Sequence, residues 1–286
     1  MEVPLIMRAF DPEVGDAVWH ALEPLVPVPV DDHPLGCHRP RIPDRVCFQG
    51  ILIRLVTGCA WVDVETLLGG QVSDTTLRAR RDGWIAAGVF DALIAEALAA
   101  YDRIIELDLT EVSLDGSQHT APCGGEGTGP NPTDRGRSGW KWSIVAGADG
   151  IPFGWALDGA NRHDMRLLEP TLAAAAQRGL LTDIETLHLD RGYDNGVTRT
   201  LCDRLGLDDL VCARKRSRGV TKLKKKLVPL GMRWPIERTN SWLSNFGQLR
   251  RNTDRRTQHR HAQLSLAVTL LITAKLIDWR DRWSPE

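Results

Sequence analysis

The 286-residue chain lacks most of the features that mark a membrane, secreted or zinc-binding protein. Its six cysteines include no CxxC pair, and none stands at zinc-finger spacing from histidine, so we expect reduced and mostly buried thiols. No stretch reaches the roughly 18 uncharged apolar residues of a membrane span, and 264–277 is interpreted as a core helix. The acidic N-terminus does not resemble a signal peptide. These absences predict a cytoplasmic protein without a membrane segment.

A phosphate-binding loop is also missing. The glycines and prolines of 124–132 do not follow the GxxxxGK[ST] pattern, and we interpret this segment as a loop after a strand. The sequence therefore offers no site of that kind for a nucleoside triphosphate.

Charge is present but unevenly distributed. The net charge is only −1, yet residues 214–260 contain fifteen Lys and Arg against two acids, Glu237 and Asp254. Such a segment favours a polyanionic partner, because neutralised phosphates release their counterions. A solvated loop or a charged helix face is the alternative. We predict a basic loop at 214–226 and DNA as the partner.

Residues 1–105 are expected to form a small helical domain. Apolar residues recur at helical spacing in 11–26, 44–58 and 74–105, and a proline-rich linker occupies 27–43. Ser73 or Asp74 is a plausible N-cap. The short helix, turn and arginine-bearing helix around this cap fit either a DNA-binding helix-turn-helix or an ordinary helical bundle.

The character of the chain changes after residue 105. Strand patterns occur at 111–118, 186–190 and 207–214, and 139–159 reads as a hairpin with Asp149-Gly150 at its turn. Helix patterns separate or follow them at 163–180, 195–206, 233–246 and 258–279. This order predicts an α/β fold: an RNase H-like mixed five-stranded sheet with helices, spanning residues 106–286 and preceded by the all-α domain.

Three acids stand at informative places in this order. Asp115 lies on the first strand, Asp190 ends the fourth, and Glu237 lies on the helix after the basic loop. Acids that converge from strand, strand and helix can hold two divalent ions such as Mg²⁺ or Mn²⁺ for phosphodiester chemistry. Taken singly, Asp115 before Gly116 would be read as turn chemistry.

The same segments resemble a known family. LDGSQHTAPCGGEGTGPNPTDRGRSGWKWSIVAGADGIPFGWALDGANRHD, LHLDRGYD and RWPIERTNSWLSNFGQLRRNTDRR are similar to those of bacterial insertion-sequence transposases of the IS5 type. The helical segment from Arg39 to about Phe90 is similar as well, so the resemblance covers roughly residues 11–277. It implies a DDE catalytic domain that cleaves DNA at inverted repeats and joins freed 3′-hydroxyls to target DNA.

The resemblance also assigns roles to residues. Asp115, Asp190 and Glu237 would carry two Mg²⁺ or Mn²⁺ ions, and Arg233 matches an arginine four residues before the glutamate. The broader superfamily often has a tyrosine and a lysine where this chain has Leu230 and Ser244. A homodimer or larger assembly is expected on double-stranded DNA.

Further residues are predicted to contact DNA, each with a structural alternative. Arg191 and Arg238 follow two of the acids and would reach phosphates or form ion pairs. Trp234 would stack on an unpaired base or pack in the core. Lys141 alternates with two tryptophans and is expected to face outward if they are buried.

His163 and Asp164 open a helix, with Asp164 in its first turn as a cap. The remaining basic candidates are Arg214, Lys215, Arg216, Arg218, Lys222, Lys224, Lys225, Lys226, Arg233, Arg250, Arg251, Arg255 and Arg256.

Two other functions remain open at this point. One is a catalytically silent or domesticated DNA-binding protein of the same ancestry, which the presence of all three acids disfavours. The other is an RNase H-like nuclease without strand transfer, which the helical domain and basic segment disfavour. Activity with Mn²⁺ and joined-strand products would separate them from a transposase.

Overall fold

The computed structural model describes residues 8–28, 40–213 and 232–283. The chain divides into two compact units, residues 1–105 with 242–286, and residues 106–241. Residues 242–286 group with the N-terminal helices instead of the sheet. The division into domains 1–105 and 106–286 stays a prediction. Which unit reads DNA remains a prediction.

The first unit is helical throughout its described part. Its helices are α2 (Pro12–Leu22), the short η1 (Glu23–Leu25), α3 (Asp44–Thr57), α4 (Trp61–Leu67), α5 (Asp74–Ala86), α6 (Val89–Ile105), α10 (Gly247–Arg250) and α11 (Thr257–Trp283). The predicted cap is present, since Ser73 accepts from the Thr76 amide at 3.2 Å. Gly58 ends α3 at φ +72°, where a Cβ would lie 2.8 Å from the Gly247 backbone.

The closing helix α11 forms the centre of this unit. It packs against α6, α2 and α5. By length and composition α11 could cross a membrane, but 72% of its apolar window is buried. Burial inside the protein accounts for its apolar sequence, so the expected core helix is confirmed.

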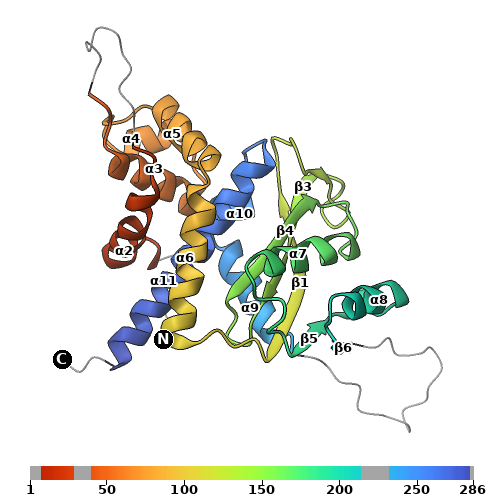
Figure 1. Cartoon of the computed structure of the whole chain (residues 1–286). Coiled ribbons are helices and arrows are strands. Elements are labelled where there is room, and N and C mark those ends of the chain that lie inside the picture. The colour runs from red at the N-terminus through yellow and green to blue at the C-terminus, as the bar shows by residue number, and fades with distance from the viewer. Residues whose placement is uncertain (1–7, 29–39, 214–231, 284–286) are drawn as a thin grey trace. The chain divides into compact units, whose positions relative to one another are not determined.

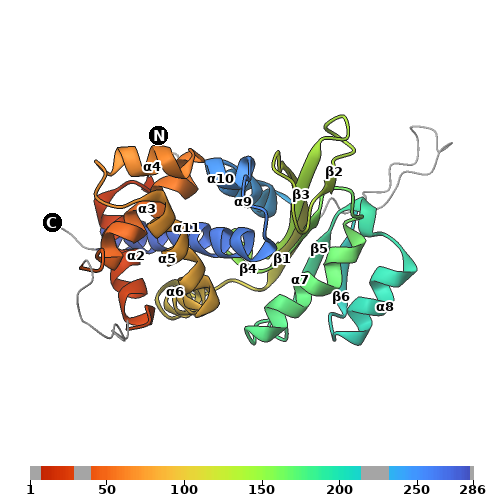
Figure 2. The same cartoon turned by 90° about the horizontal axis from the view of Figure 1, so that it is seen from above.

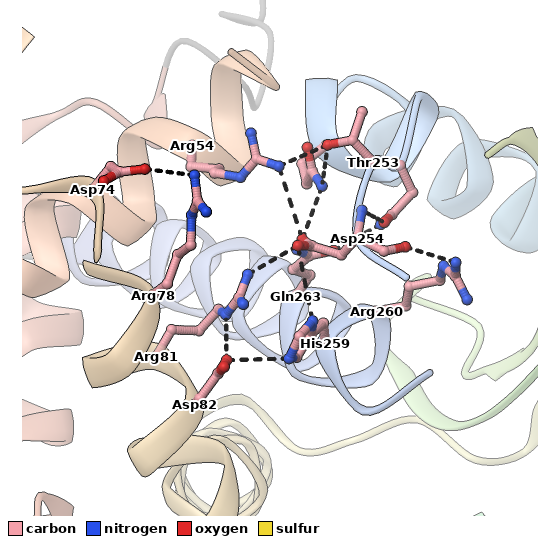
Figure 3. Close-up of polar contacts among 12 residues, drawn as sticks. Arg54, Asp74, Arg78, Arg81, Asp82, Thr253, Asp254, His259, Arg260 and Gln263 are labelled. Carbon is pink, nitrogen blue, oxygen red and sulfur yellow. Dashed lines mark hydrogen bonds and ion pairs between the residues drawn. The ribbon is translucent and has the colours of Figure 1, made fainter. Parts of the chain in front are cut away.

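A buried carboxylate, Asp254, ties several helices of this unit together (Figure 3). Its Oδ1 accepts from Arg81 at 2.9 Å, and its Oδ2 accepts from Gln248 at 3.0 Å and Gln263 at 2.6 Å. Burial alone would raise the pKa of Asp254, but the Arg81 and Arg54 guanidiniums outweigh burial and hold this pKa below its ordinary value.

The second unit contains a mixed sheet (Figure 1). Its strands are β1 (Glu111–Thr120), β2 (Gly129–Pro130), β3 (Ser138–Ala146), β4 (Pro152–Gly159), β5 (Thr186–Leu189) and β6 (Asp209–Cys212). The path β2-β3-β1-β5-β6 is joined by β4, which pairs with β3. β1, β3 and β4 are antiparallel, whereas β5 and β6 run parallel to β1. The five expected strands are present in an RNase H-like arrangement, and the two-residue β2 is an addition inside the predicted loop.

Helices cover the two faces of this sheet differently (Figure 2). α7 (Met165–Gln177) packs on β3 and β4, and α8 (Gly196–Arg204) follows β5 and the short η2 (Arg191–Tyr193). α9 (Trp234–Ser244) lies on the opposite face, where Asn240 accepts from the Trp142 indole at 2.8 Å. Trp142 is the β3 partner of Ser117 on β1, two residues from Asp115, so α9 lies on the face of that acid.

Candidate active site on the sheet

Asp115 and Asp190 lie side by side on adjacent strands. β1 and β5 are parallel and pair Leu114 with Leu189, so the next residue of each chain segment is one of the two acids. Residues in matching register on parallel neighbours project to the same face, about 4.8 Å apart at the backbone. The end of β5 at Leu189 leaves Asp190 at the start of η2, where it accepts from the Gly192 amide at 2.6 Å.

Glu237 and Asp115 both lie near the Arg233 guanidinium. The Arg233 guanidinium lies 3.5 Å from the Asp115 carboxylate and 3.5 Å from the Glu237 carboxylate. Its carbonyl also accepts from the Glu237 amide at 3.0 Å, which begins the helical hydrogen bonding of α9. The strand acid and the helix acid therefore lie at the same distance from one guanidinium nitrogen.

The body of α9 is attached to the β3–β4 turn. Thr239 donates to the Gly150 carbonyl and Arg238 donates to the Asp149 carbonyl, both at 2.6 Å. Gly150 adopts φ +81°, and a Cβ there would lie 3.0 Å from each of these two side chains. The predicted Asp149-Gly150 turn thus also supports the helix that carries Glu237.

The electrostatic environment of Asp115 disfavours its ionised form. Burial raises the pKa of Asp115, and the nearby charges of Asp190 and Asp164 raise it further, while the Gly116 amide and Arg233 act in the opposite direction without cancelling the rise. Tyr193 is buried beside these three acids, and burial followed by their negative charges raises the pKa of its hydroxyl. Asp115 is therefore a carboxylate whose ionised form is disfavoured by its surroundings.

Asp164 is a member of this group that the sequence did not identify. It was expected to cap α7, but its side chain makes no capping hydrogen bond. Instead the Lys141 ammonium donates to Asp164 Oδ1 at 2.6 Å. A Cβ on Gly116 would lie 3.0 Å from that same oxygen, so Asp164 lies against β1 at the residue after Asp115, on the face to which that Cβ would point. The signal available in the sequence was the polar NRHD segment directly after a strand.

The expectation for Lys141 is wrong. The lysine does alternate with Trp140 and Trp142, but its side chain is only 2% exposed. Both faces of β3 are covered, so alternation does not turn Lys141 toward solvent. Its ammonium is held by Asp164 and is not available on the surface for DNA.

Other predicted DNA contacts near the acids have distinct surroundings. Arg191 is exposed. Trp234 is 55% exposed, and the Arg238 guanidinium lies 4.5 Å from its ring centroid. Arg238 is also bound to the β3–β4 turn, which favours its structural interpretation over phosphate binding. Trp234 is therefore not a core residue, and base stacking remains a prediction.

The basic residues farther along the chain fall into two groups. Arg250, Arg251, Arg255 and Arg256 are all exposed in the first unit. The basic loop lies outside the described residues: Arg214, Lys215, Arg216, Arg218, Lys222, Lys224, Lys225 and Lys226. Contact with DNA remains a prediction for both groups.

The arginines of α5 are largely engaged within the first unit. Arg80 pairs with Asp44, and Arg81 binds Asp82 and Asp254. Arg78 pairs with Asp74 at 2.5 Å on the same helix. These contacts favour the interpretation of α4 and α5 as part of a helical bundle over a helix-turn-helix, in which the arginines of the recognition helix would face DNA bases.

The chemistry of the donor set suits a hard divalent ion. Asp115, Asp190 and Glu237 provide only carboxylate oxygens, the ligands that Mg²⁺ and Mn²⁺ prefer. Among the residues that the structure describes, no three His, Cys, Asp or Glu form a ready-made metal cluster. Arg233 is the cation between Asp115 and Glu237. The raised pKa of Asp115 is consistent with a site that still requires positive charge.

Comparison with known proteins settles the family. A model described as "Transposase DDE domain" matches residues 101–273, and one described as "Putative transposase of IS4/5 family" matches residues 14–94. The chain belongs to the DDE-domain transposases. Since this is a family of transposases, DNA is the substrate, and divalent metal ions generally serve its chemistry.

Two relatives from Burkholderia cepacia agree with this membership. The transposase is 37% identical over 149 residues to "Putative transposase for insertion sequence element IS402", covering 50% of this chain and 67% of the relative. It is 32% identical over 121 residues to "Insertion element IS402 uncharacterized 16.2 kDa protein", covering 42% and 82%. No solved structure matches the transposase.

Proposed function

We propose that this transposase cleaves DNA at the inverted-repeat ends of its own element and joins the freed 3′-hydroxyls to target DNA, with Asp115, Asp190 and Glu237 as metal ligands. The observation that carries the proposal is that Asp115 and Asp190 directly follow the register pair of Leu114 and Leu189, while Asp115 and Glu237 both lie 3.5 Å from Arg233. Strand, strand and helix thus bring oxygen donors to one face of the sheet.

The residues around the proposed site have different proposed roles. When bound, two Mg²⁺ or Mn²⁺ ions activate a water or a 3′-hydroxyl and stabilise the leaving oxygen. Asp115, Asp190 and Glu237 hold these ions, and Arg233 is the neighbouring donor for a scissile phosphate. Exposed Arg191 and Trp234 bind a phosphate and an unpaired base beside the site.

The DNA outside the cleaved bond is held by the basic residues. The proposal assigns backbone phosphates to Arg250, Arg251, Arg255 and Arg256, which are exposed, and to the basic loop 214–226. A dimer or larger assembly brings two element ends together. The protein acts in the bacterial cytoplasm at the nucleoid.

Cleavage of the chain's own element ends tests this proposal. The purified protein is mixed with a labelled duplex carrying those terminal sequences, with Mg²⁺ or Mn²⁺, and compared with Asp190→Asn. We expect nicking that depends on the metal and is lost in the variant, followed by joined strands when target DNA is added. Equal nicking by the variant would overturn the assignment of Asp190.

The alternatives give different products in the same assay. A silent DNA-binding protein retains the duplex but does not cut it with either metal. A nuclease without strand transfer nicks the duplex and gives no joined product.

A further inference from the structure

The backbone just before α9 is bound at both of its polar groups by the sheet. The Met232 amide donates to His188 Nδ1 at 3.1 Å. The Ser113 hydroxyl donates to the Met232 carbonyl. Ser113 on β1 and His188 on β5 are register partners, so one cross-strand pair holds both groups of a single residue.

The tautomer of His188 follows from these partners. Because Nδ1 accepts from the Met232 amide, it carries no proton, and the proton lies on Nε2. Nε2 then donates to the Glu111 carboxylate, which also belongs to β1. Ser113 and His188 are 1% and 7% exposed, so their polar atoms lie away from water and are costly to leave without a partner.

Met232 stands next to the residues of the proposed site. Arg233 follows Met232 in the chain. Its guanidinium contacts Asp115, and its carbonyl accepts from the Glu237 amide at 3.0 Å. A displacement of Met232 would therefore move Arg233, whose carbonyl accepts from the Glu237 amide in the first turn of α9. Thr239 and Arg238 bind the β3–β4 turn from the second turn of α9, so the contacts of Met232 are a separate attachment at the start of the helix.

We propose that Glu111, Ser113 and His188 form a strand clamp whose role is to position Glu237 opposite Asp115. The inference rests on the proposed function, in which Glu237 binds the metal ion. The clamp residues are positioning residues, because they act through Met232 and not on DNA or metal. Residues that orient metal ligands typically change metal affinity by about 10- to 100-fold when altered.

A pair of isosteric variants separates positioning from general stability. In His188→Asn, the amide oxygen replaces Nδ1 and can still accept from Met232. In His188→Gln, the amide replaces Nε2 and keeps the Glu111 contact but loses the Met232 contact. Both variants exchange one buried ring for an amide, so a purely structural role predicts similar effects. Ser113→Ala provides a third variant that removes only the bond to the Met232 carbonyl.

Two measurements on the full chain without DNA test the clamp. The first is Mn²⁺ binding, followed by the magnetic resonance signal of free Mn²⁺, with Glu237→Gln as reference. The second is hydrogen exchange of peptides covering 232–240. We expect His188→Gln and Ser113→Ala to weaken Mn²⁺ binding about 10-fold and to accelerate exchange. His188→Asn should stay close to the unchanged chain in both.

The outcomes distinguish failure of the clamp from failure of the proposed function. Equal changes in His188→Asn and His188→Gln would overturn the clamp, as would unchanged exchange in His188→Gln. If Glu237→Gln leaves Mn²⁺ binding unchanged, the metal role of Glu237 is wrong. Exchange then still decides whether the clamp fixes the start of α9.

Discussion

Asp254 in the helical unit is a buried carboxylate and Asp115 on the sheet is a partly buried one, and their surroundings differ. Asp254 accepts from Arg81, Gln248 and Gln263. Asp115 accepts from the Gly116 amide at 2.8 Å and has Arg233 only at 3.5 Å. As a result, the pKa of Asp254 is lowered and the pKa of Asp115 is raised.

This difference separates a structural acid from a candidate functional acid. The protein itself supplies the donors that Asp254 needs, so its charge stabilises the packing of the helices. The surroundings of Asp115 disfavour its charged form, which costs folding free energy but suits the binding of an external cation. Both acids are aspartates, so residue type does not distinguish them. Their hydrogen-bond and ion-pair partners do.

The largest expected effect is on cleavage. Asp115→Asn should reduce cleavage about 1,000-fold, because losing a ligand forfeits several kcal/mol of transition-state stabilisation. The melting temperature should stay the same or rise, because a neutral amide avoids the burial cost that raises the pKa of Asp115. Labelled-duplex cleavage and thermal melting of the same preparation check both statements. A large loss of stability would remove the contrast with Asp254.

The matched variant in the helical unit should behave in the opposite way. Asp254→Asn removes the buried anion that Arg81 and Arg54 share, although Arg81 keeps its contact with Asp82, and should destabilise the first unit by about 3–5 kcal/mol. Thermal unfolding at pH 7 measures this cost.

The pH dependence of that cost has a definite sign. The folded pKa of Asp254 is depressed below 3.8, so its contribution is present above that value and is lost as pH falls through the folded pKa. The difference in melting temperature between the unchanged chain and Asp254→Asn should therefore shrink in acid. A constant difference down to the lowest pH would contradict the charged role of Asp254.

A smaller effect is expected at the exposed arginines near Asp254. Replacing Arg250, Arg251, Arg255 and Arg256 together by Gln should lower the salt dependence of DNA binding by about 3 to 4 in the log–log slope. Their exposure predicts little change in unfolding free energy. Affinity titrations over a salt series measure the slope, and an unchanged slope would exclude this cluster from the interface.

The smallest effect on DNA binding is expected at Lys141. Because its ammonium is buried against Asp164, Lys141→Met should leave the log–log slope of DNA affinity against salt concentration unchanged. Any change should be smaller than the change expected for the loss of one phosphate contact. The same salt series provides the measurement, with Arg255→Gln as the exposed control. A slope reduced by about 1 would mean that Lys141 reaches DNA after all.

Much of the architecture was accessible from local patterns. Strand alternation, the Asp149-Gly150 turn, the Ser73 cap and glycines after helices predicted the longer helices and the five main strands in their order, but not the short β2, η2 and α10. The mixed sheet followed from that order, because a hairpin followed by crossovers restricts the possible topologies. The register that pairs Leu114 with Leu189 was not accessible, since it depends on long-range strand pairing.

The surroundings of charged residues were harder to predict. Lys141 was expected outside because alternation shows which residues share a face but not whether that face is covered. Asp164 was expected to cap a helix because its nearest neighbours in sequence are helical, yet its partner comes from 23 residues away. The partners of Arg80 and Arg81 are likewise set by helices distant in sequence.

The sequence by itself determined the order of strands and helices, the family and the three candidate acids, because these depend on local pattern and on segments that resemble a transposase. The tertiary structure decided which charges are compensated. Asp254 is neutralised by α3 and α5, whereas Asp115 is left beside Asp190 and Asp164 with Arg233 as a nearby cation. The physical reason is that burial and Coulomb interactions depend on distances in space, which sequence separation does not fix.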